Sequence, residues 1–176
     1  MKNIKSLERN LMQDRADNLA RPVIENEIEE GRLLLTFSVS DEKYALDDNV
    51  IDSVIDVTHV TPLPFIPDGF SGMIYHAGQD WLALNTGAFF QEMTAEPFLH
   101  FILVRLEQFR LAFGCHDIIG QISYYKDDEL LQLNTKQMRR SEFIQGIFNQ
   151  DIAFIHHKAL LHWLDHLNLQ DSIGVS

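Results

Sequence analysis

One arrangement of short β-strands occurs twice in this chain, and that repetition constrains the fold more than any other feature. Between residues 33 and 39, apolar side chains alternate with Thr36 and Ser38, which is the period of a strand with one buried face. A polar turn leads to a second strand over 44–46, so the two strands are expected to form a hairpin. After Pro97 an apolar strand, a tight turn and a returning strand follow in the same order.

The correspondence between the two halves extends beyond the first hairpin. Residues 44–55 (YALDDNVIDSVI) align without a gap with residues 111–122 (LAFGCHDIIGQI), and each segment follows a hairpin. Later, SGMIYHAGQDWLALN is echoed by QGIFNQDIAFIHH, with Gly72 opposite Gly146. Such a repeat predicts an internally duplicated, mainly β protein. We expect two five-stranded SH3-like β-barrels that share a core, because closure hides sheet edges and one barrel alone would bury little.

Helical patterns flank the duplicated region. Residues 4–21 form a predicted amphipathic N-terminal helix that ends before Pro22, and an acidic linker follows it. This helix can pack on the domain, bind a partner or serve as a flexible leader. The predicted divisions are an N-terminal helix and linker over 1–32, a domain over 33–176, subdomain one over about 33–95, subdomain two over about 96–165 and a C-terminal closing helix over 158–169.

Acidic residues outnumber basic ones by 26 to 14, which gives a formal net charge of −12. Such a surface repels phosphate backbones and anionic lipid headgroups, so nucleic acid and membrane-surface partners are disfavoured. No apolar run approaches the roughly 18–20 residues of a membrane span, and the N-terminus lacks the apolar core of a signal peptide. We therefore expect a cytoplasmic protein without direct membrane insertion.

Few residue patterns indicate catalysis. Cys115 is the single cysteine, so no intrachain disulfide can form, and its apolar neighbours predict a small buried side chain. His162 and His166 lie four residues apart on the predicted helix, a spacing that can chelate zinc, and His156 precedes them. The helical metalloprotease motif needs glutamate where this chain has Trp163. A small metal-dependent hydrolase using these histidines stays an alternative, while we expect no catalytic residue, no metal site and no cofactor.

Together these motifs resemble the CheW-like domain of bacterial chemosensory adaptors. The family's hairpin pattern F-x-x-G-x-x-x-Y-G-[IV] corresponds to residues 37–46, its V-x-E-[IV] to 51–54, and its N-L-R-G turn to 75–78. The second half fits as well, so the resemblance covers about residues 33–165. It implies two intertwined barrels that perform no chemistry. It also implies an adaptor that couples the tip of methyl-accepting receptors to the regulatory domain of a CheA-type histidine kinase, which has the same fold, through barrel edges and the groove between them.

Three residues depart from the family pattern. Ala77 stands in place of the arginine of the turn, Ser53 in place of the glutamate, and Asn85 in place of the aspartate of V-D-L. Loss of these charges leaves two interpretations open: an altered partner, or a divergent scaffold that no longer couples to a kinase. A scaffold that binds an unrelated protein, for instance through its N-terminal helix, is a third. Ile51 and Tyr75 are equally well explained as core residues. The candidate partner-binding residues are Ile51, Ser53, Tyr75, His76, Ala77 and Gly78.

Overall fold

The computed structural model describes residues 31–56, 59–91, 97–125, 128, 130–131 and 139–167. The helix predicted over 4–21 and its linker lie outside the described residues, except for the linker's last two positions. In chain order the elements are β1 (Arg32–Val39), β2 (Glu42–Asp47), η1 (Asp48–Val50), β3 (Ile51–Asp56), β4 (Phe70–His76), β5 (Gln79–Leu84), α2 (Thr86–Phe90), β6 (His100–Leu106), β7 (Phe109–Cys115), β8 (Asp117–Tyr124), η2 (Ser141–Phe143), β9 (Ile144–Phe148), β10 (Ile152–Ile155) and α3 (His157–His166).

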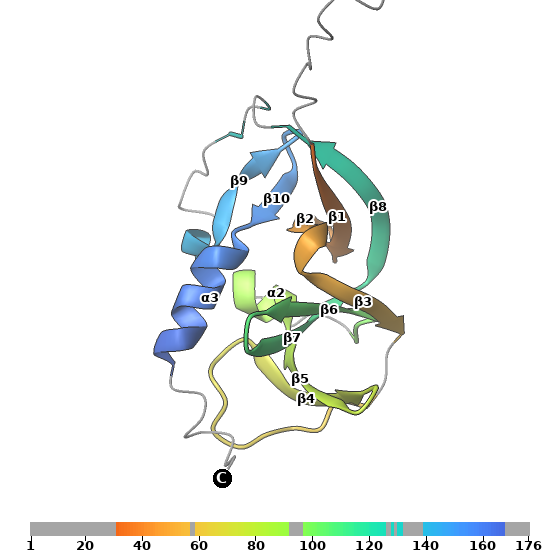
Figure 1. Cartoon of the computed structure of the whole chain (residues 1–176), viewed down its shortest axis with the longest axis vertical. Coiled ribbons are helices and arrows are strands. Elements are labelled where there is room, and N and C mark those ends of the chain that lie inside the picture. The colour runs from red at the N-terminus through yellow and green to blue at the C-terminus, as the bar shows by residue number, and fades with distance from the viewer. Residues whose placement is uncertain are drawn as a thin grey trace, which may run out of the picture. The chain divides into compact units, whose positions relative to one another are not determined.

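The strands form two five-stranded sheets, which lie one above the other in Figure 1. Sheet A has the order β8-β1-β2-β10-β9, and sheet B has the order β3-β6-β7-β5-β4. Neighbours are antiparallel except for the pairs β2–β10 and β5–β7, which are parallel. Within the described ranges no ladder joins the two edge strands of either sheet. The fold is therefore mainly β with few helices, and the predicted barrels are observed as two sheets whose hydrogen-bonded ladders stay open.

Each sheet contains strands from both halves of the sequence. The hairpin β1–β2 from the first half lies in sheet A beside β8, β9 and β10 from the second half. The hairpin β6–β7 from the second half lies in sheet B beside β3, β4 and β5 from the first. Equivalent strands occupy equivalent places in the two orders, β3 matching β8 and β5 matching β10. The two halves thus exchange their first hairpins, as expected for intertwined copies.

The predicted correspondence of Gly72 and Gly146 is also present in three dimensions. A Cβ atom on Gly72 would overlap the carbonyl oxygen of Thr61, and one on Gly146 would lie 3.3 Å from the carbonyl oxygen of Leu131. In both halves, therefore, a preceding loop segment crosses closely over a glycine that has no side chain to block it. Each crossing is fixed by an isolated antiparallel bridge to the residue that follows the glycine, Thr61–Met73 in one half and Leu131–Ile147 in the other.

Buried apolar side chains gather in three clusters, which explains why several strands are buried on both faces. Successive residues of a strand point to opposite sides of the sheet. Leu35 and Phe37 of β1 accordingly join a large core shared by both sheets, whereas Leu34 joins a smaller cluster with Tyr124 and Phe154. Sheet B likewise has a cluster of its own, made by Ile74, Trp81, Ala83, Phe101, Leu103 and Ala112. Each sheet thus contributes to the common core and to a private one.

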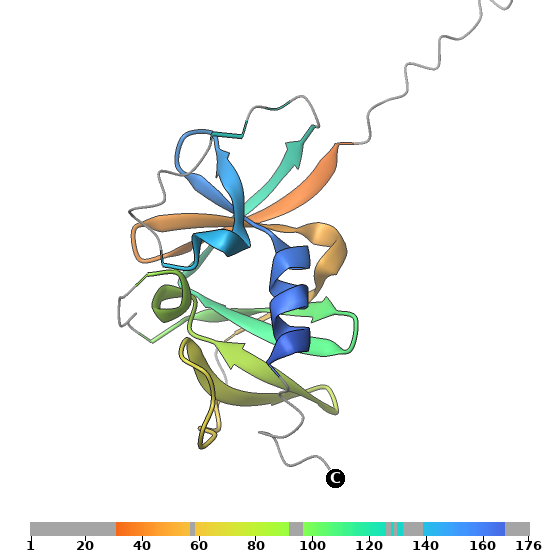
Figure 2. The ribbon, with the colours of Figure 1, turned by 90° about the vertical axis from the view of Figure 1, so that its left-hand side faces the viewer.

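The closing helix predicted over 158–169 corresponds to α3, although residues 168 and 169 lie outside the described part of the chain. Leu160 and Leu164 of α3 are buried in the shared core. Figure 2 shows α3 running alongside both sheets, which agrees with its place in Figure 1. None of the described helices is both long and apolar enough to cross a bilayer.

Candidate protein-binding surface

Two of the predicted contact residues lie on β3, an edge strand of sheet B. Ile51 is partly buried and packs against the shared core, so its interpretation as a core residue agrees with the structure. Ser53 is half-buried. The alternating exposure of β3 instead presents Asp52 and Val54 to solvent, and Val54 keeps 42% of its surface exposed. The most exposed side chains of β3 are therefore the neighbours of the two predicted residues, because periodicity alone does not establish which face of the strand is buried.

The other predicted residues form the hairpin between β4 and β5. Tyr75 is 70% exposed, so it is not part of the core. Ala77 and Gly78 have φ values of 49° and 76°, and both are therefore left-handed, as a two-residue turn with right-handed strand twist requires. His76 pairs with Gln79 across this turn. The turn thus holds Tyr75 outward on a short and well-defined hairpin.

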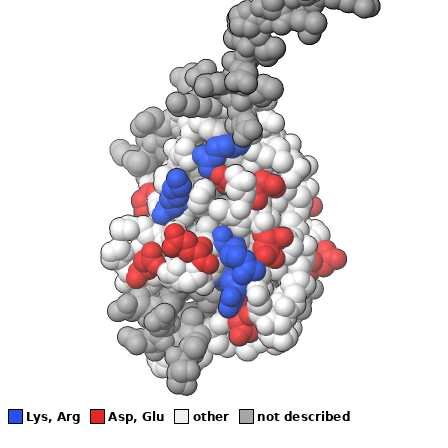
Figure 3. All heavy atoms as spheres, in the orientation of Figure 1, with Lys and Arg blue, Asp and Glu red and all other residues white. Residues whose placement is uncertain are grey.

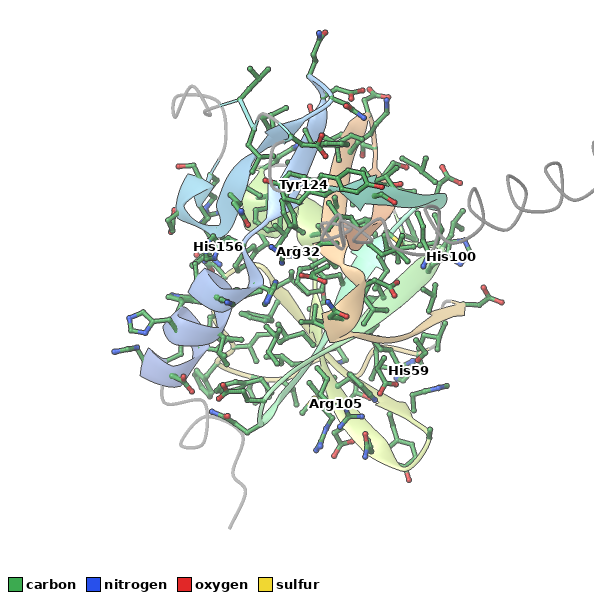
Figure 4. All side chains as sticks on the ribbon, turned by 45° about the horizontal axis from the view of Figure 1, so that its top comes forward. Arg32, His59, His100, Arg105, Tyr124 and His156 are labelled. Atoms are coloured by element: carbon green, nitrogen blue, oxygen red, sulfur yellow. The ribbon has the colours of Figure 1, made fainter. Side chains whose placement is uncertain are left out.

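Arg105 of β6 joins the two groups. Its Nη2 lies 3.0 Å from Oδ1 of Asp52 and 3.0 Å from Oε1 of Gln79. The guanidinium also lies over the indole ring of Trp81, 5.3 Å from the ring centroid. Asp52 lies on β3, which is next to β6, and Gln79 is the first residue of β5, which lies two strands from β6 in sheet B, so Arg105 connects side chains from β3 and β5. Figure 4 shows Arg105 beside β4 and β5, far from Arg32 and Tyr124 of sheet A.

We use the name adaptor face for a set of residues on sheet B: the hydrogen-bonded group Asp52, Gln79 and Arg105, together with the exposed residues Val54 and Tyr75. Its charges are mixed, because Arg105 pairs with Asp52 and the neighbouring Arg110 donates from Nε to the carbonyl oxygen of Asp80 at 3.1 Å. Figure 3 likewise shows Lys and Arg side chains among Asp and Glu side chains on the face that it presents. The adaptor face therefore offers an exposed aromatic ring, that of Tyr75, and an exposed guanidinium, that of Arg105, among charges of both signs.

Sequence reasoning missed Arg105, although one signal was present. It is the only Lys or Arg in the apolar strand β6, and it lies opposite Arg110 in the β6–β7 hairpin. A cation in such a strand needs a partner or solvent. Its partners come from residues 53 and 26 positions away in sequence, so local patterns do not identify them.

Asn85, the third departure from the family pattern, has a structural role that an aspartate shares. It is the N-cap of α2, where its Oδ1 accepts a hydrogen bond from the backbone N–H of Ala88 at 3.0 Å. Asn and Asp are both strong N-cap residues. The exchange of aspartate for asparagine therefore leaves the local backbone satisfied.

Two of the three histidines of the metal-site alternative have side chains in contact with the backbone of α3. Nδ1 of His156 accepts a hydrogen bond from the backbone N–H of Ala159 at 2.9 Å and so caps α3. Nδ1 of His166 lies 2.6 Å from the carbonyl oxygen of His162. In the described part of the chain no three His, Cys, Asp or Glu side chains are grouped to hold a metal ion.

Cys115 is fully buried, as its apolar neighbours predicted. Burial, with a smaller effect of Asp117, raises the pKa of the thiol to about 12. The thiol is therefore protonated at neutral pH and unsuited to nucleophilic attack.

Comparison with known proteins agrees with this arrangement. The sequence profile of the CheW-like domain matches residues 33–170. No curated protein matches the chain by sequence. Among solved structures, the scaffolding protein TtCheW from Thermoanaerobacter tengcongensis has a similar fold, with a TM-score of 0.62 and 17% identity, over 71% of this chain and 84% of that one. The chain therefore belongs to the CheW-like domain family, whose members are non-catalytic chemotaxis scaffolds.

Proposed function

We propose that this chain is an adaptor that couples methyl-accepting receptors to a CheA-type histidine kinase by binding the receptor tip and the kinase's regulatory domain. The observation that carries the proposal is the family match over residues 33–170. Membership of a family of scaffolds directs the search for function to surfaces, because such proteins act by holding other proteins together. The proposal includes a cytoplasmic location, where a kinase and a receptor tip would meet.

The adaptor face supports this proposal by its chemistry. Tyrosine and arginine are enriched among the residues that dominate binding energy at protein interfaces. Tyr75 is exposed on a hairpin with a two-residue turn. Arg105 is held by two hydrogen bonds, so its side chain loses little freedom when a partner docks. The other predicted residues would position the side chains of this face through the backbone of β3 and of the β4–β5 turn; they are Ile51, Ser53, His76, Ala77 and Gly78.

Arg105 also bears on the missing arginine of the turn. The family pattern has a guanidinium at the position of Ala77, whereas this chain has one on β6 that reaches Gln79, next to the turn. We propose that Arg105 replaces the missing donor from a different strand. The same surface would then offer a similar charge to a partner, despite the departure in sequence.

The same proposal describes each curled sheet as an SH3-like barrel. It is supported by the private cluster of apolar side chains that each sheet contains. Edges that curl toward one another without a continuous ladder would leave β3 and β8 accessible to partners.

Binding assays with purified proteins test the function. The full chain, titrated by calorimetry with a CheA-type regulatory domain and with a receptor-tip fragment from the same organism, should bind both. Tyr75→Ala should weaken binding at least about 30-fold, as expected for an interface hot spot. Leu99→Ala is the matched control, because Leu99 is 57% exposed and lies outside both the adaptor face and the edge strands. A folded chain that binds neither protein would refute the proposal.

A second function is favoured by Ala77 and Ser53, which remove two charges of the family pattern. A scaffold that has lost kinase coupling would bind the receptor tip and leave the regulatory domain unbound. The same titrations separate the two functions.

A further inference from the structure

The loop over 59–69, which joins β3 to β4, presents one aromatic side chain to solvent. Phe65 is 95% exposed, the highest value among the large apolar residues of the described chain that are exposed. On either side of it, Leu63 and Ile66 are partly buried and pack against the shared core. Leu63 and Ile66 thus point toward the core, while the larger side chain of Phe65 points to solvent. Stability alone would favour burial of the larger apolar side chain.

This loop is rigid at both ends. At its start, Thr61 and Met73 exchange two backbone hydrogen bonds of 2.8 Å. At its end, the backbone N–H of Asn85 donates to the carbonyl oxygen of Gly69 at 2.8 Å. Three prolines further restrict its backbone, namely Pro62, Pro64 and Pro67.

Two consecutive arginines, Arg139 and Arg140, contact Asp68 of the loop. Nη2 of Arg140 donates to the carbonyl oxygen of Asp68 at 3.0 Å, and Nη2 of Arg139 lies 3.6 Å from the Asp68 carboxylate. The Arg140 guanidinium stacks over Phe89 at 4.1 Å and lies 5.0 Å from the Trp163 ring centroid. Burial between these rings lowers the pKa of Arg140 from its usual value. Arg140 thereby ties the loop to both α2 and α3.

The backbone at Phe65 itself is strained. Its φ is 58°, in the left-handed region that a bulky side chain rarely adopts. Strain of this kind persists only where the surroundings impose it, and it concentrates at sites of recognition. Here the surroundings that impose it are the bridge at Thr61, the prolines and the arginine pair.

We infer that Phe65 is an anchor that inserts into an apolar pocket of the CheA-type regulatory domain, an inference that rests on the proposed function. The loop backbone is already held by its hydrogen bonds, so little backbone freedom is lost on binding, and aromatic residues are enriched at the cores of interfaces. Of the two proposed partners, the regulatory domain is a folded globular domain, which can offer a concave apolar pocket. Asp68 and Glu142 balance Arg139 and Arg140, so the charged groups around the loop sum to zero in a chain of net charge −12, and the loop favours a pocket that is apolar and carries little net charge.

Substitution of Phe65 tests the inference directly. Phe65→Ala removes the ring, and Phe65→Asn removes it while keeping a residue that tolerates a positive φ. Both variants should bind the regulatory domain at least about 30-fold more weakly than the wild-type chain, the loss expected of a hot spot. Their unfolding midpoints in urea should not fall, since the ring contacts almost nothing in the free protein. Leu99→Ala, at a residue that is 57% exposed and directly precedes β6, should leave binding unchanged.

Arg140→Met tests whether Arg140 positions the loop. It should weaken binding in the wild-type chain but add no loss in the Phe65→Ala background, because the two residues act through one contact. Equal binding of wild type and both Phe65 variants would overturn the anchor. A loss confined to the receptor tip would overturn the assignment of the partner. A wild-type chain that binds neither protein would instead overturn the proposed function, and this inference with it.

Discussion

Two glycines with nearly the same φ offer a test of how tightly the loop over 59–69 is packed. Gly72 in β4 has a φ of 144°, and Gly120 in β8 has a φ of 149°. A Cβ on Gly120 would meet nothing within 4 Å. A Cβ on Gly72 would overlap the Thr61 carbonyl oxygen and lie 2.8 Å from its carbonyl carbon. Alanine at the two positions therefore carries a similar conformational strain but differs in the steric clash.

The expected magnitudes follow from these contacts. The conformational strain costs about 1–3 kcal/mol at either position, since this region of φ is adopted almost only by glycine. Gly72→Ala must in addition push Thr61 away, which breaks the two backbone hydrogen bonds between Thr61 and Met73. At about 1 kcal/mol for each bond, Gly72→Ala should lower the free energy of unfolding by about 2 kcal/mol more than Gly120→Ala.

Urea denaturation of the full-length variants measures this difference, and amide hydrogen exchange locates it. In Gly72→Ala, the amide of Met73 should exchange faster, because its acceptor is the Thr61 carbonyl oxygen. In Gly120→Ala, the same amide should keep its protection relative to global unfolding. If both variants lose the same free energy within about 0.5 kcal/mol, the crossing over Gly72 is not a tight contact and the rigidity ascribed to the loop is wrong.

Three further predictions concern the helices and the pH dependence. Asn85→Ala should lower the free energy of unfolding by about 1 kcal/mol in urea denaturation, whereas Asn85→Asp should retain it, because only the first loses the cap of α2. Trp163→Ala should cost about 3 kcal/mol and weaken the near-ultraviolet circular dichroism, since the indole packs against Phe70, Phe89 and Phe143. Burial lowers the pKa of His157 below its usual 6.5. Below about pH 6.5 His157 is therefore protonated more fully in the unfolded chain than in the folded one, so the free energy of unfolding should fall as the pH drops. His157→Gln should reduce this fall, as measured by urea denaturation at pH 7.5 and pH 5.

The strands were largely predictable because each carries its pattern locally. The alternation in β1 and the turn before β2 are properties of adjacent residues, and the structure has both strands where the pattern predicts them. The helix α2 was not predicted. Its five residues include a glycine and are too few to show a helical period. Its existence depends on the cap at Asn85 and on the burial of Phe89 and Phe90, which only the folded chain provides.

The exchange of hairpins and the adaptor face depended on contacts that are distant in sequence. Periodicity predicts that a strand exists, but it does not specify which strand lies beside it, so the pairing of β1 with β8 was beyond local reasoning. The same limit applies to Arg105, whose two partners lie on β3 and β5. Tyr75 and the turn at Ala77 were found from the family pattern because that part of the surface is continuous in sequence. How these residues act in binding stays a prediction.

The exchanged hairpins have a consequence for how such a protein can be divided. A fragment that ends near Asn85 would contain β1 and β2 but none of the strands that flank them in sheet A. Two copies of this fragment would both lack β6 to β10. Each copy could nevertheless place its β1–β2 hairpin beside the β3, β4 and β5 strands of the other copy, where the β6–β7 hairpin lies in the full chain. The full chain therefore has the architecture of a domain-swapped dimer whose subunits have been fused end to end. Cutting it between the halves should yield pieces that acquire stable structure only by reassembling in pairs.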